Sequence, residues 1–451
     1  MHHDGDLRMS RRVIGNAVSV MTVQAGTYLL PLINIPYLLR VIGPEHYGLI
    51  AFSQAVMAYF ITLNDYGFNL SATRELAVRR DDPVLRSELY SAVMAIKSSF
   101  CLLSFFILLA LVRFVPRFHE HGPIFFASFG IVVGTMLFPQ WYFQGIEKMY
   151  WISAMNLAAN VVFTAGIYLL VRKPSDFLVA AIVQAAGKVV AGVLGVVILF
   201  STEHLRLTLP TFGQLRHRFS DGWHLFLSSA AATFYTSSNA VVLGVICGMT
   251  QVGYFSAAYK IFAAGQGLVS PMCQAMYPHV CTLAHRSREL AVLYLRKAMI
   301  VIGGITFGGG VLVILLAKVI VRVLMGPKYG ASVPVLEFMA LTPFACAINN
   351  IYGTQGMLNF GLKPQYSRII ILSAFFNNII LVPLCFCFKA SGAAASALLT
   401  ETLVTLVMAL MLCGRKIDLL PRSSDLKLCV ASLPFFSSRK TIEAQENELQ
   451  A

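Results

Sequence analysis

The apolar positions of the chain gather into long stretches separated by short polar segments, and this pattern predicts membrane-spanning helices. A helix needs roughly 20 mostly apolar residues to cross the hydrocarbon core of a bilayer. Twelve stretches meet this requirement, with approximate limits at 13–38, 47–69, 88–112, 123–142, 150–171, 177–200, 223–248, 253–278, 297–323, 333–357, 366–388 and 390–413. The sequence therefore predicts an all-α integral membrane protein with about 12 transmembrane helices.

The composition agrees with a membrane protein, and the distribution of charge predicts its orientation. Of the 451 residues, 57% are hydrophobic and 12% are charged, whereas an average soluble domain carries about 25% charged residues. The net charge of +14 does not indicate nucleic-acid binding, because such proteins concentrate basic residues on a soluble face, which this pattern lacks. Most of the 35 Lys and Arg residues fall in segments that face the cytoplasm if both termini are cytoplasmic, as the positive-inside rule requires.

A short internal similarity predicts two halves. Residues 47–51 (YGLIA), which open the second predicted span, resemble residues 252–256 (VGYFS), which open the eighth. An offset of six spans gives both halves the same orientation, so we expect parallel repeats related by an axis along the membrane normal, with a transport cavity between them. The predicted parts are a cytoplasmic N-terminal segment (1–12), a six-helix half (13–200), a cytoplasmic connecting loop (201–222), a second six-helix half (223–413) and a cytoplasmic tail (414–451).

Three lysines lie inside apolar stretches, where a charge costs several kcal/mol unless it faces the protein interior or a water-filled cavity. They are Lys97, Lys188 and Lys260. Lys188 is the deepest, roughly 16 Å from the end of its span at 1.5 Å rise per residue. Lys97 and Lys260 are shallower, so a cavity role and a snorkelling or ion-paired role stay open for them. All three are candidate substrate-binding residues, and they indicate a transporter.

Four other charged residues are candidates for coupling or gating. Glu401 lies in the middle of the twelfth span and Glu337 near the outward end of the tenth. A carboxylate within the membrane can carry a proton and so couple transport to an ion gradient, although a structural Lys–Glu pair explains it equally well. Asp65 and Arg74 are candidates for a gate at the cytoplasmic mouth. A solvated helix end is at least as good an explanation for these two.

Aromatic and amide side chains add to this picture. The aromatic groups at 141–143 and 150–151 fall at span ends, which predicts anchoring at the membrane interface. Amides inside the spans can bridge helices or line a hydrophilic cavity large enough for a sugar. These amides are Asn16, Gln24, Asn156, Asn160, Gln184, Asn239, Gln266, Asn349, Asn350, Gln355, Asn377 and Asn378.

Signatures of enzymes are missing from the sequence. It contains no phosphate-binding loop, no His-Glu-x-x-His and no Gly-x-Ser-x-Gly. The nine cysteines offer only a bare Cys385-x-Cys387 as a metal-ligand spacing. The sequence therefore predicts no catalytic residue, no metal site and no cofactor.

Several strings of the chain together resemble one known family. They are residues 38–48 (LLRVIGPEHYG), 65–68 (DYGF), 72–75 (ATRE), 141–149 (WYFQGIEKM), 252–261 (VGYFSAAYKI), 326–329 (GPKY) and 355–357 (QGM). This combination is similar to the bacterial polysaccharide transporters of the Wzx or RfbX type, the O-antigen flippases. The resemblance extends over roughly residues 10–413, and the tail after Cys413 shows no family pattern.

The resemblance implies a fold similar to the multidrug and toxin extrusion (MATE) transporters within the wider MOP exporter superfamily. It also implies a flippase that moves undecaprenyl-pyrophosphate-linked oligosaccharide repeat units across the bacterial inner membrane by alternating access. Membrane lipids, a polysaccharide polymerase and a chain-length regulator would be its partners, and nucleic acid would not. The cationic spans suit a pyrophosphate.

Two alternatives stay open at this point. The first is an ion-coupled small-molecule antiporter of the same fold, although a preference for cationic drugs would call for acidic rather than basic residues in the cavity. The second is a membrane polymerase or glycosyltransferase. Enzymes of that kind need a substantial outward loop for their substrate, and the predicted outward loops are short.

Overall fold

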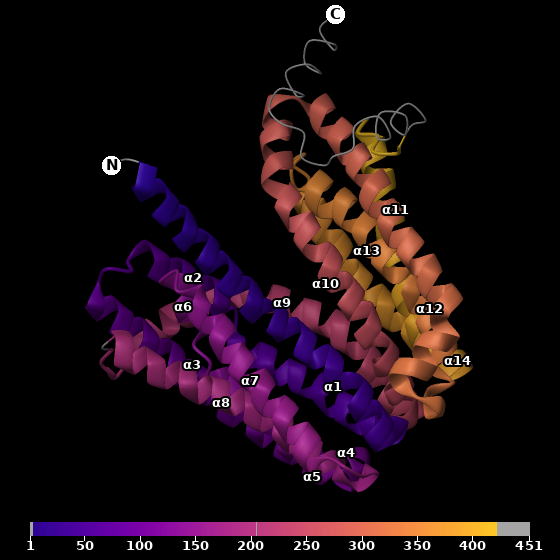
Figure 1. Ribbon diagram of the computed structural model, residues 1–451, viewed down its shortest axis with the longest axis horizontal. Coiled ribbons are helices and arrows are strands. Elements are labelled where there is room, and N and C mark those ends of the chain that lie inside the picture. The colour runs from indigo at the N-terminus through magenta and orange to yellow at the C-terminus, as the bar shows by residue number, and fades with distance from the viewer. Residues whose placement is uncertain (1–2, 204, 422–451) are drawn as a thin grey trace, which may run out of the picture. The chain divides into compact units, whose positions relative to one another are not determined.

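The computed structural model describes residues 3–203 and 205–421, and this part of the chain forms helices and no strand. The elements in chain order are α1 (His3–Asp65), α2 (Phe68–Val78), α3 (Pro83–Phe114), α4 (Pro116–Glu120), α5 (Gly122–Leu137), α6 (Gln140–Gly145), α7 (Met149–Leu170), η1 (Pro174–Asp176), α8 (Phe177–Glu203), α9 (Phe212–Cys247), α10 (Met249–Arg286), α11 (Arg288–Ile320), η2 (Val321–Met325), η3 (Pro327–Tyr329), α12 (Ser332–Ala340), α13 (Thr342–Asn350), η4 (Ile351–Met357) and α14 (Lys363–Gly414). Figure 1 shows their arrangement.

The predicted spans are confirmed by these helices. Among the described residues, nine helical segments are long and apolar enough to cross a membrane. The break that we expect between the first two spans is at Gly43 in α1, and that between the last two is at Lys389 in α14. When each part of α1 and α14 is taken separately and the 38-residue α10 is included, the fold has about 12 spans.

One boundary differs from the prediction, and another falls largely outside the described residues. Helix α9 begins at Phe212, inside the predicted connecting loop 201–222. The cause is a capping box in which the Thr211 hydroxyl accepts a hydrogen bond from the Gln214 backbone N–H, while the Gln214 side chain accepts one from the Thr211 N–H. The predicted tail 414–451 lies outside the described residues from residue 422 onward.

The chain forms two compact units. Among the described residues, the first unit contains 3–203, 205–257, 318–333 and 378–393, and the second contains 258–317, 334–377 and 394–421. These units follow spatial proximity rather than the chain order of the two halves, so the division into halves at 201–222 stays a prediction.

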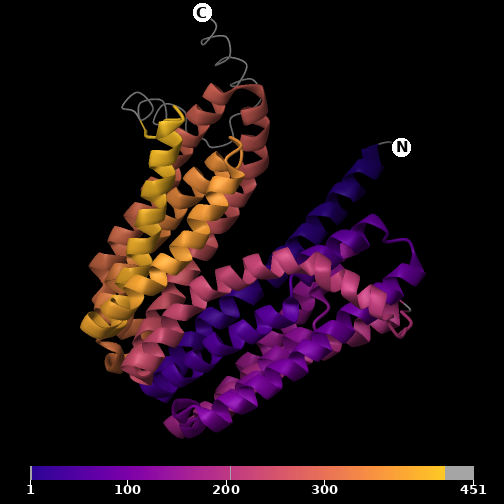
Figure 2. The same ribbon diagram turned by 180° about the vertical axis from the view of Figure 1, so that it is seen from behind.

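In the first unit, α8 packs against α5 and α7 (Figure 1), and α9 runs along α1 (Figure 2). Small residues let the membrane helices approach closely. A Cβ placed on Gly192 of α8, for example, would lie 2.6 Å from the carbonyl oxygen of Gly134 in α5. In the second unit, α10, α11, α13, η4 and α14 surround one apolar core that includes Val280, Leu295, Ile348, Tyr352 and Met408.

A reciprocal contact in the first unit joins the two strings that resemble each other. Gly43 and Gly248 have nearly the same left-handed conformation, with φ of 76° and 88° and ψ of 174° and 170°, which favours glycine. Five residues after each of them, Gly48 packs on the carbonyl of Met249, and Gly253 packs on the carbonyl of Pro44. We call this contact the glycine crossing. It is the self-complementary contact that a two-fold axis produces, as expected for parallel repeats.

We predict that Gly253→Ala lowers the thermal unfolding temperature of the purified protein, because its Cβ would collide with the backbone carbonyl of Pro44. Overpacking of this kind costs about 1–3 kcal/mol. The matched control is Gly304→Ala in α11, where the added Cβ meets open space and alanine favours the helix. Unfolding temperatures that fall equally for both variants would show that the crossing is not a tight contact.

Candidate functional site

Lys97 and Asp65 are oppositely charged neighbours in the first unit, although no salt bridge joins these two described side chains. Lys97 of α3 is 3% exposed, and its charge and that of Asp65, at the end of α1, attract each other. The backbone N–H of Asn69 also donates a hydrogen bond to Asp65. A nearby opposite charge lowers the cost of burying an ammonium group, so Asp65 partly compensates the charge of Lys97.

Lys188 lies on a polar strip between α8 and α1. Gln54 of α1 donates a hydrogen bond from Nε2 to Oε1 of Gln184 at 2.5 Å. Lys188 follows Gln184 by one helical turn on α8, so both side chains lie on the same face. Lys188 is half-buried, and the described residues include no hydrogen bond or ion pair to it. Its positive charge is therefore less compensated than that of Lys97.

The sequence analysis missed a charge cluster around a buried carboxylate at one end of this unit. The Glu203 side chain, 7% exposed, pairs with Arg86 at 2.5 Å and with Lys148 at 2.6 Å. Nε of Arg86 also donates a hydrogen bond to the Tyr142 hydroxyl at 2.9 Å. Glu203 thereby ties α8 to the start of α3 and to the turn before α7.

The predicted interface anchoring of residues 141–143 is wrong. Trp141, Tyr142 and Phe143 are each 0% exposed and belong to the core that α2, α3, α6 and α8 share. Tyr150, in contrast, is 54% exposed, which agrees with a place at the membrane surface. The span-end position alone did not reveal that α6 turns its aromatic side chains inward.

The gate candidates Asp65 and Arg74 occupy different surroundings. Asp65 faces Lys97, as described above, whereas Arg74 is exposed on α2. It is the neighbouring Glu75 that forms an ion pair, with Arg218 of α9. This pair and the ring stacking of Tyr66 on Phe226, with centroids 4.9 Å apart, connect the end of α1 and the start of α2 to α9.

Glu401 has polar partners in the second unit. Asn349 of α13 donates a hydrogen bond from Nδ2 to Oε2 of Glu401 at 2.8 Å, and the Cys346 side chain is also hydrogen-bonded to this carboxylate. Glu337 of α12 and Lys260 of α10 are half-buried in the same unit. Two of the groups that contact the Glu401 carboxylate are therefore neutral.

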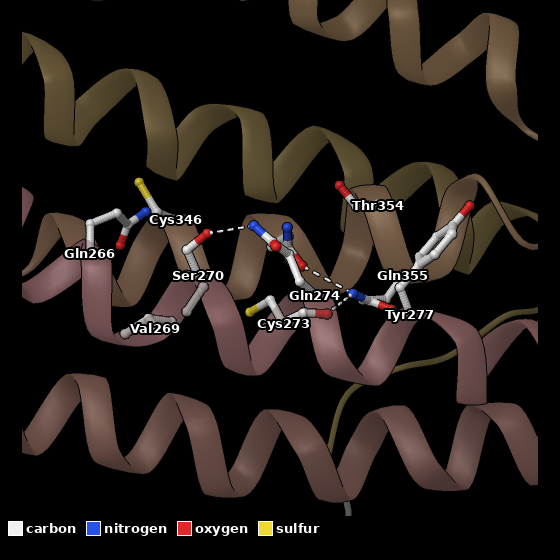
Figure 3. Close-up of a pocket in the computed structure, with 11 residues that line it drawn as sticks. Gln266, Val269, Ser270, Cys273, Gln274, Tyr277, Cys346, Thr354 and Gln355 are labelled. Atoms are coloured by element: carbon white, nitrogen blue, oxygen red, sulfur yellow. Dashed lines mark hydrogen bonds between the residues drawn. The ribbon is translucent and has the colours of Figure 1, made fainter. Parts of the chain in front are cut away.

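A polar pocket lies between α10 and the α13–η4 segment of the second unit (Figure 3). Its volume is about 380 Å³. The lining residues are all uncharged side chains: Gln266, Val269, Ser270, Cys273, Gln274, Tyr277, Cys346, Ala347, Asn350, Thr354 and Gln355. We call it the amide pocket.

The hydrogen bonds of the amide pocket leave some of its polar atoms free. Nε2 of Gln355, a residue only 1% exposed, donates to the Cys273 carbonyl at 2.8 Å and to Oδ1 of Asn350 at 3.4 Å. Gln274 donates to the Ser270 hydroxyl at 3.1 Å. Oε1 of Gln355 and Oε1 of Gln266 are buried and have no hydrogen-bond partner among the described residues.

The sequence analysis identified some residues of the amide pocket but did not predict that they lie together. Gln266, Asn350 and Gln355 are among the intramembrane amides noted there, without any grouping. The missed signal is spacing, because Gln266, Ser270 and Gln274 are four residues apart and so form one stripe on α10.

The chain matches known proteins over most of its length. The family model described as polysaccharide biosynthesis protein matches residues 13–284. A curated protein of Escherichia coli (strain K12), described as an O-antigen transporter, is 32% identical over 402 residues, which are 89% of this chain and 97% of that protein. One of Shigella dysenteriae with the same description is 28% identical over 87% of this chain and 98% of its own length.

Two solved structures show the same fold. A multidrug resistance transporter of the MATE family and MOP superfamily, in an inward-facing conformation, has a TM-score of 0.68 at 14% identity and covers 87% of this chain and 94% of its own. The lipid II flippase MurJ, in an inward closed conformation, has a TM-score of 0.69 at 15% identity, with 92% and 90% covered. The expected MATE-like fold is therefore confirmed.

The Asp65–Lys97 pair generates a prediction about stability. Lys97→Met should lower the thermal unfolding temperature, because it leaves the Asp65 carboxylate without a nearby compensating charge, a loss of up to about 3 kcal/mol, the lower bound for a buried pair in direct contact. The double variant Asp65→Asn with Lys97→Met removes both charges and should recover most of the loss. If the single and double variants unfold at the same temperature, the two charges do not stabilise each other.

Proposed function

This chain belongs to the polysaccharide biosynthesis protein family, and from that membership we propose that it is a flippase for lipid-linked oligosaccharide repeat units in O-antigen or related surface polysaccharide synthesis. The observation that carries the proposal is the match to relatives described as O-antigen transporters over nearly their whole length. The fold shared with a lipid II flippase supports it. The cargo we propose is an undecaprenyl-pyrophosphate-linked oligosaccharide.

The distribution of charge supports an anionic cargo. A pyrophosphate carries negative charge, and a cation in a poorly hydrated cavity attracts it more strongly than a cation in water does. Lys188 is the leading residue for this role, because Asp65 compensates Lys97. Lys260 would add positive potential from the second unit, and Lys97 would act together with Asp65.

We propose that transport proceeds by alternating access across the bacterial inner membrane, with both termini in the cytoplasm. The charge distribution along the sequence supports this orientation. It would put the glycine crossing on the outward side and the Glu203 cluster on the cytoplasmic side. The Glu75–Arg218 pair would then lie at the cytoplasmic mouth beside Asp65 and Arg74, which we propose as gate residues.

Glu401 remains the leading residue for coupling to an ion gradient, with Glu337 as the second candidate. Its position in the middle of a span, with a hydrogen bond from Asn349 and a contact with Cys346, supports this role. A polysaccharide polymerase and a chain-length regulator would use the exported repeat unit. The relatives are described as transporters, which favours transport over the polymerase or glycosyltransferase alternative.

The proposal predicts the behaviour of Lys188 variants in a strain from which the gene for this chain has been deleted. The wild-type chain should restore surface polysaccharide, and Lys188→Arg should restore it as well. Lys188→Ala should reduce export at least about 10-fold, the effect of losing one hydrogen bond to a charged group. Polysaccharide is measured by gel electrophoresis, and membrane levels of each variant by immunoblot.

The matched control is Lys318→Ala, which removes an exposed lysine near the end of α11 and should export normally. Normal export by Lys188→Ala would show that this lysine does not bind the cargo. The flippase proposal itself would still stand. Failure of the wild-type chain to restore any polysaccharide would contradict the flippase proposal itself.

A further inference from the structure

We propose that the amide pocket of the second unit is a subsite for a neutral, hydroxyl-bearing sugar residue of the cargo. The inference rests on the proposed function, and it adds where the carbohydrate part of the cargo binds and by what chemistry. Its basis is a pocket of about 380 Å³ lined by uncharged side chains, most of them polar, and this volume lies within the 300–1,000 Å³ that is typical of small-molecule sites.

The unpaired acceptors of the pocket define the chemistry of the ligand. Oε1 of Gln355 and Oε1 of Gln266 are buried, and the part of the chain that the structure describes gives them no donor. A buried acceptor without a donor costs about 1–3 kcal/mol, so a ligand that brings donors is favoured once either amide turns its Oε1 toward the pocket. Sugar hydroxyls and acetamido N–H groups are such donors, whereas phosphate oxygens are acceptors only.

The rest of the lining complements those acceptors. Ser270 and Thr354 offer hydroxyl groups, and Gln274 offers an amide that already donates to Ser270. Tyr277, 36% exposed, presents its ring and hydroxyl at the same pocket (Figure 3). Groups that both donate and accept match the hydroxyls of a pyranose, which also do both.

The pocket has no charged lining residue among those described. A site for the pyrophosphate would need cations or an array of donors. We therefore propose that different side chains bind the two parts of the cargo. Lysines attract the pyrophosphate, and amides and hydroxyls bind a sugar. Because each polar contact is directional, the amide pocket would contribute to discrimination between repeat units.

A binding experiment on the purified full-length chain with two lipids distinguishes the contribution of the sugar from that of the pyrophosphate. One probe is the lipid-linked repeat unit extracted from the complemented strain, and the other is undecaprenyl pyrophosphate without sugar. The test variant Gln274→Leu with Thr354→Val removes an amide and a hydroxyl from the pocket at similar volume. The control is Gln365→Leu, which removes an amide at the start of α14, outside the pocket.

We expect the double variant to bind the lipid-linked repeat unit about 10-fold more weakly, as the loss of two hydrogen bonds predicts. Its affinity for undecaprenyl pyrophosphate and its thermal unfolding temperature should stay unchanged. The control should match the wild type with both lipids. A pocket filled only by water, or one that takes no part in binding, would leave both affinities of the double variant unchanged, and this result would overturn the assignment.

A charge variant distinguishes sugar from anion even if the double variant fails to fold. Gln274→Glu keeps acceptors for hydroxyl groups, so binding of the repeat unit should fall only a few-fold, and binding of undecaprenyl pyrophosphate should not change. If the pocket holds the pyrophosphate, the added negative charge will strongly weaken the binding of both lipids. This result would overturn the sugar assignment. A wild-type chain that binds neither lipid would instead contradict the proposed function.

Discussion

The cost of polar and charged groups in hydrocarbon is the constraint on which this structure depends. Each backbone segment that crosses the membrane satisfies its own hydrogen bonds as a helix. Several polar side chains within the spans have polar partners: Gln54 bonds to Gln184, Asn349 bonds to Glu401, and the charges of Asp65 and Lys97 attract each other. Where pairing is incomplete among the described residues, as at Lys188 and in the amide pocket, the same cost favours a ligand that supplies the missing partner.

These incomplete places differ in chemistry. The first unit has a half-buried cation on the polar face of α8, and the second has buried amide acceptors in an uncharged pocket. A lipid-linked oligosaccharide has an anionic part and a neutral hydroxylated part, so one cargo can account for both. A small cationic drug would explain neither feature.

Much of the fold could be predicted from the sequence. The hydropathy of each segment alone indicates whether it can lie in lipid, so each span is recognised without knowledge of its tertiary contacts. The breaks at Gly43 and Lys389 fell where we expected them, and the similarity of residues 47–51 and 252–256 coincides with a reciprocal contact at Gly48 and Gly253. What could not be predicted depends on tertiary contacts. The burial of Trp141 follows from the inward turn of α6, and the partners of Glu203 come from two other segments. The candidate site shows the same limit, since the sequence marked lysines and amides but not which of them have partners.

Direct measurement of lipid translocation tests the central claim. The full-length chain is reconstituted into liposomes with the lipid-linked repeat unit in the inner leaflet, and a membrane-impermeant oxidant of sugars reports its appearance in the outer leaflet. We predict that protein-containing liposomes expose the repeat unit over time, while protein-free liposomes do not. If the folded, inserted chain exposes it no faster than protein-free liposomes do, even with an ion gradient of either sign, the account of this protein as a flippase is contradicted.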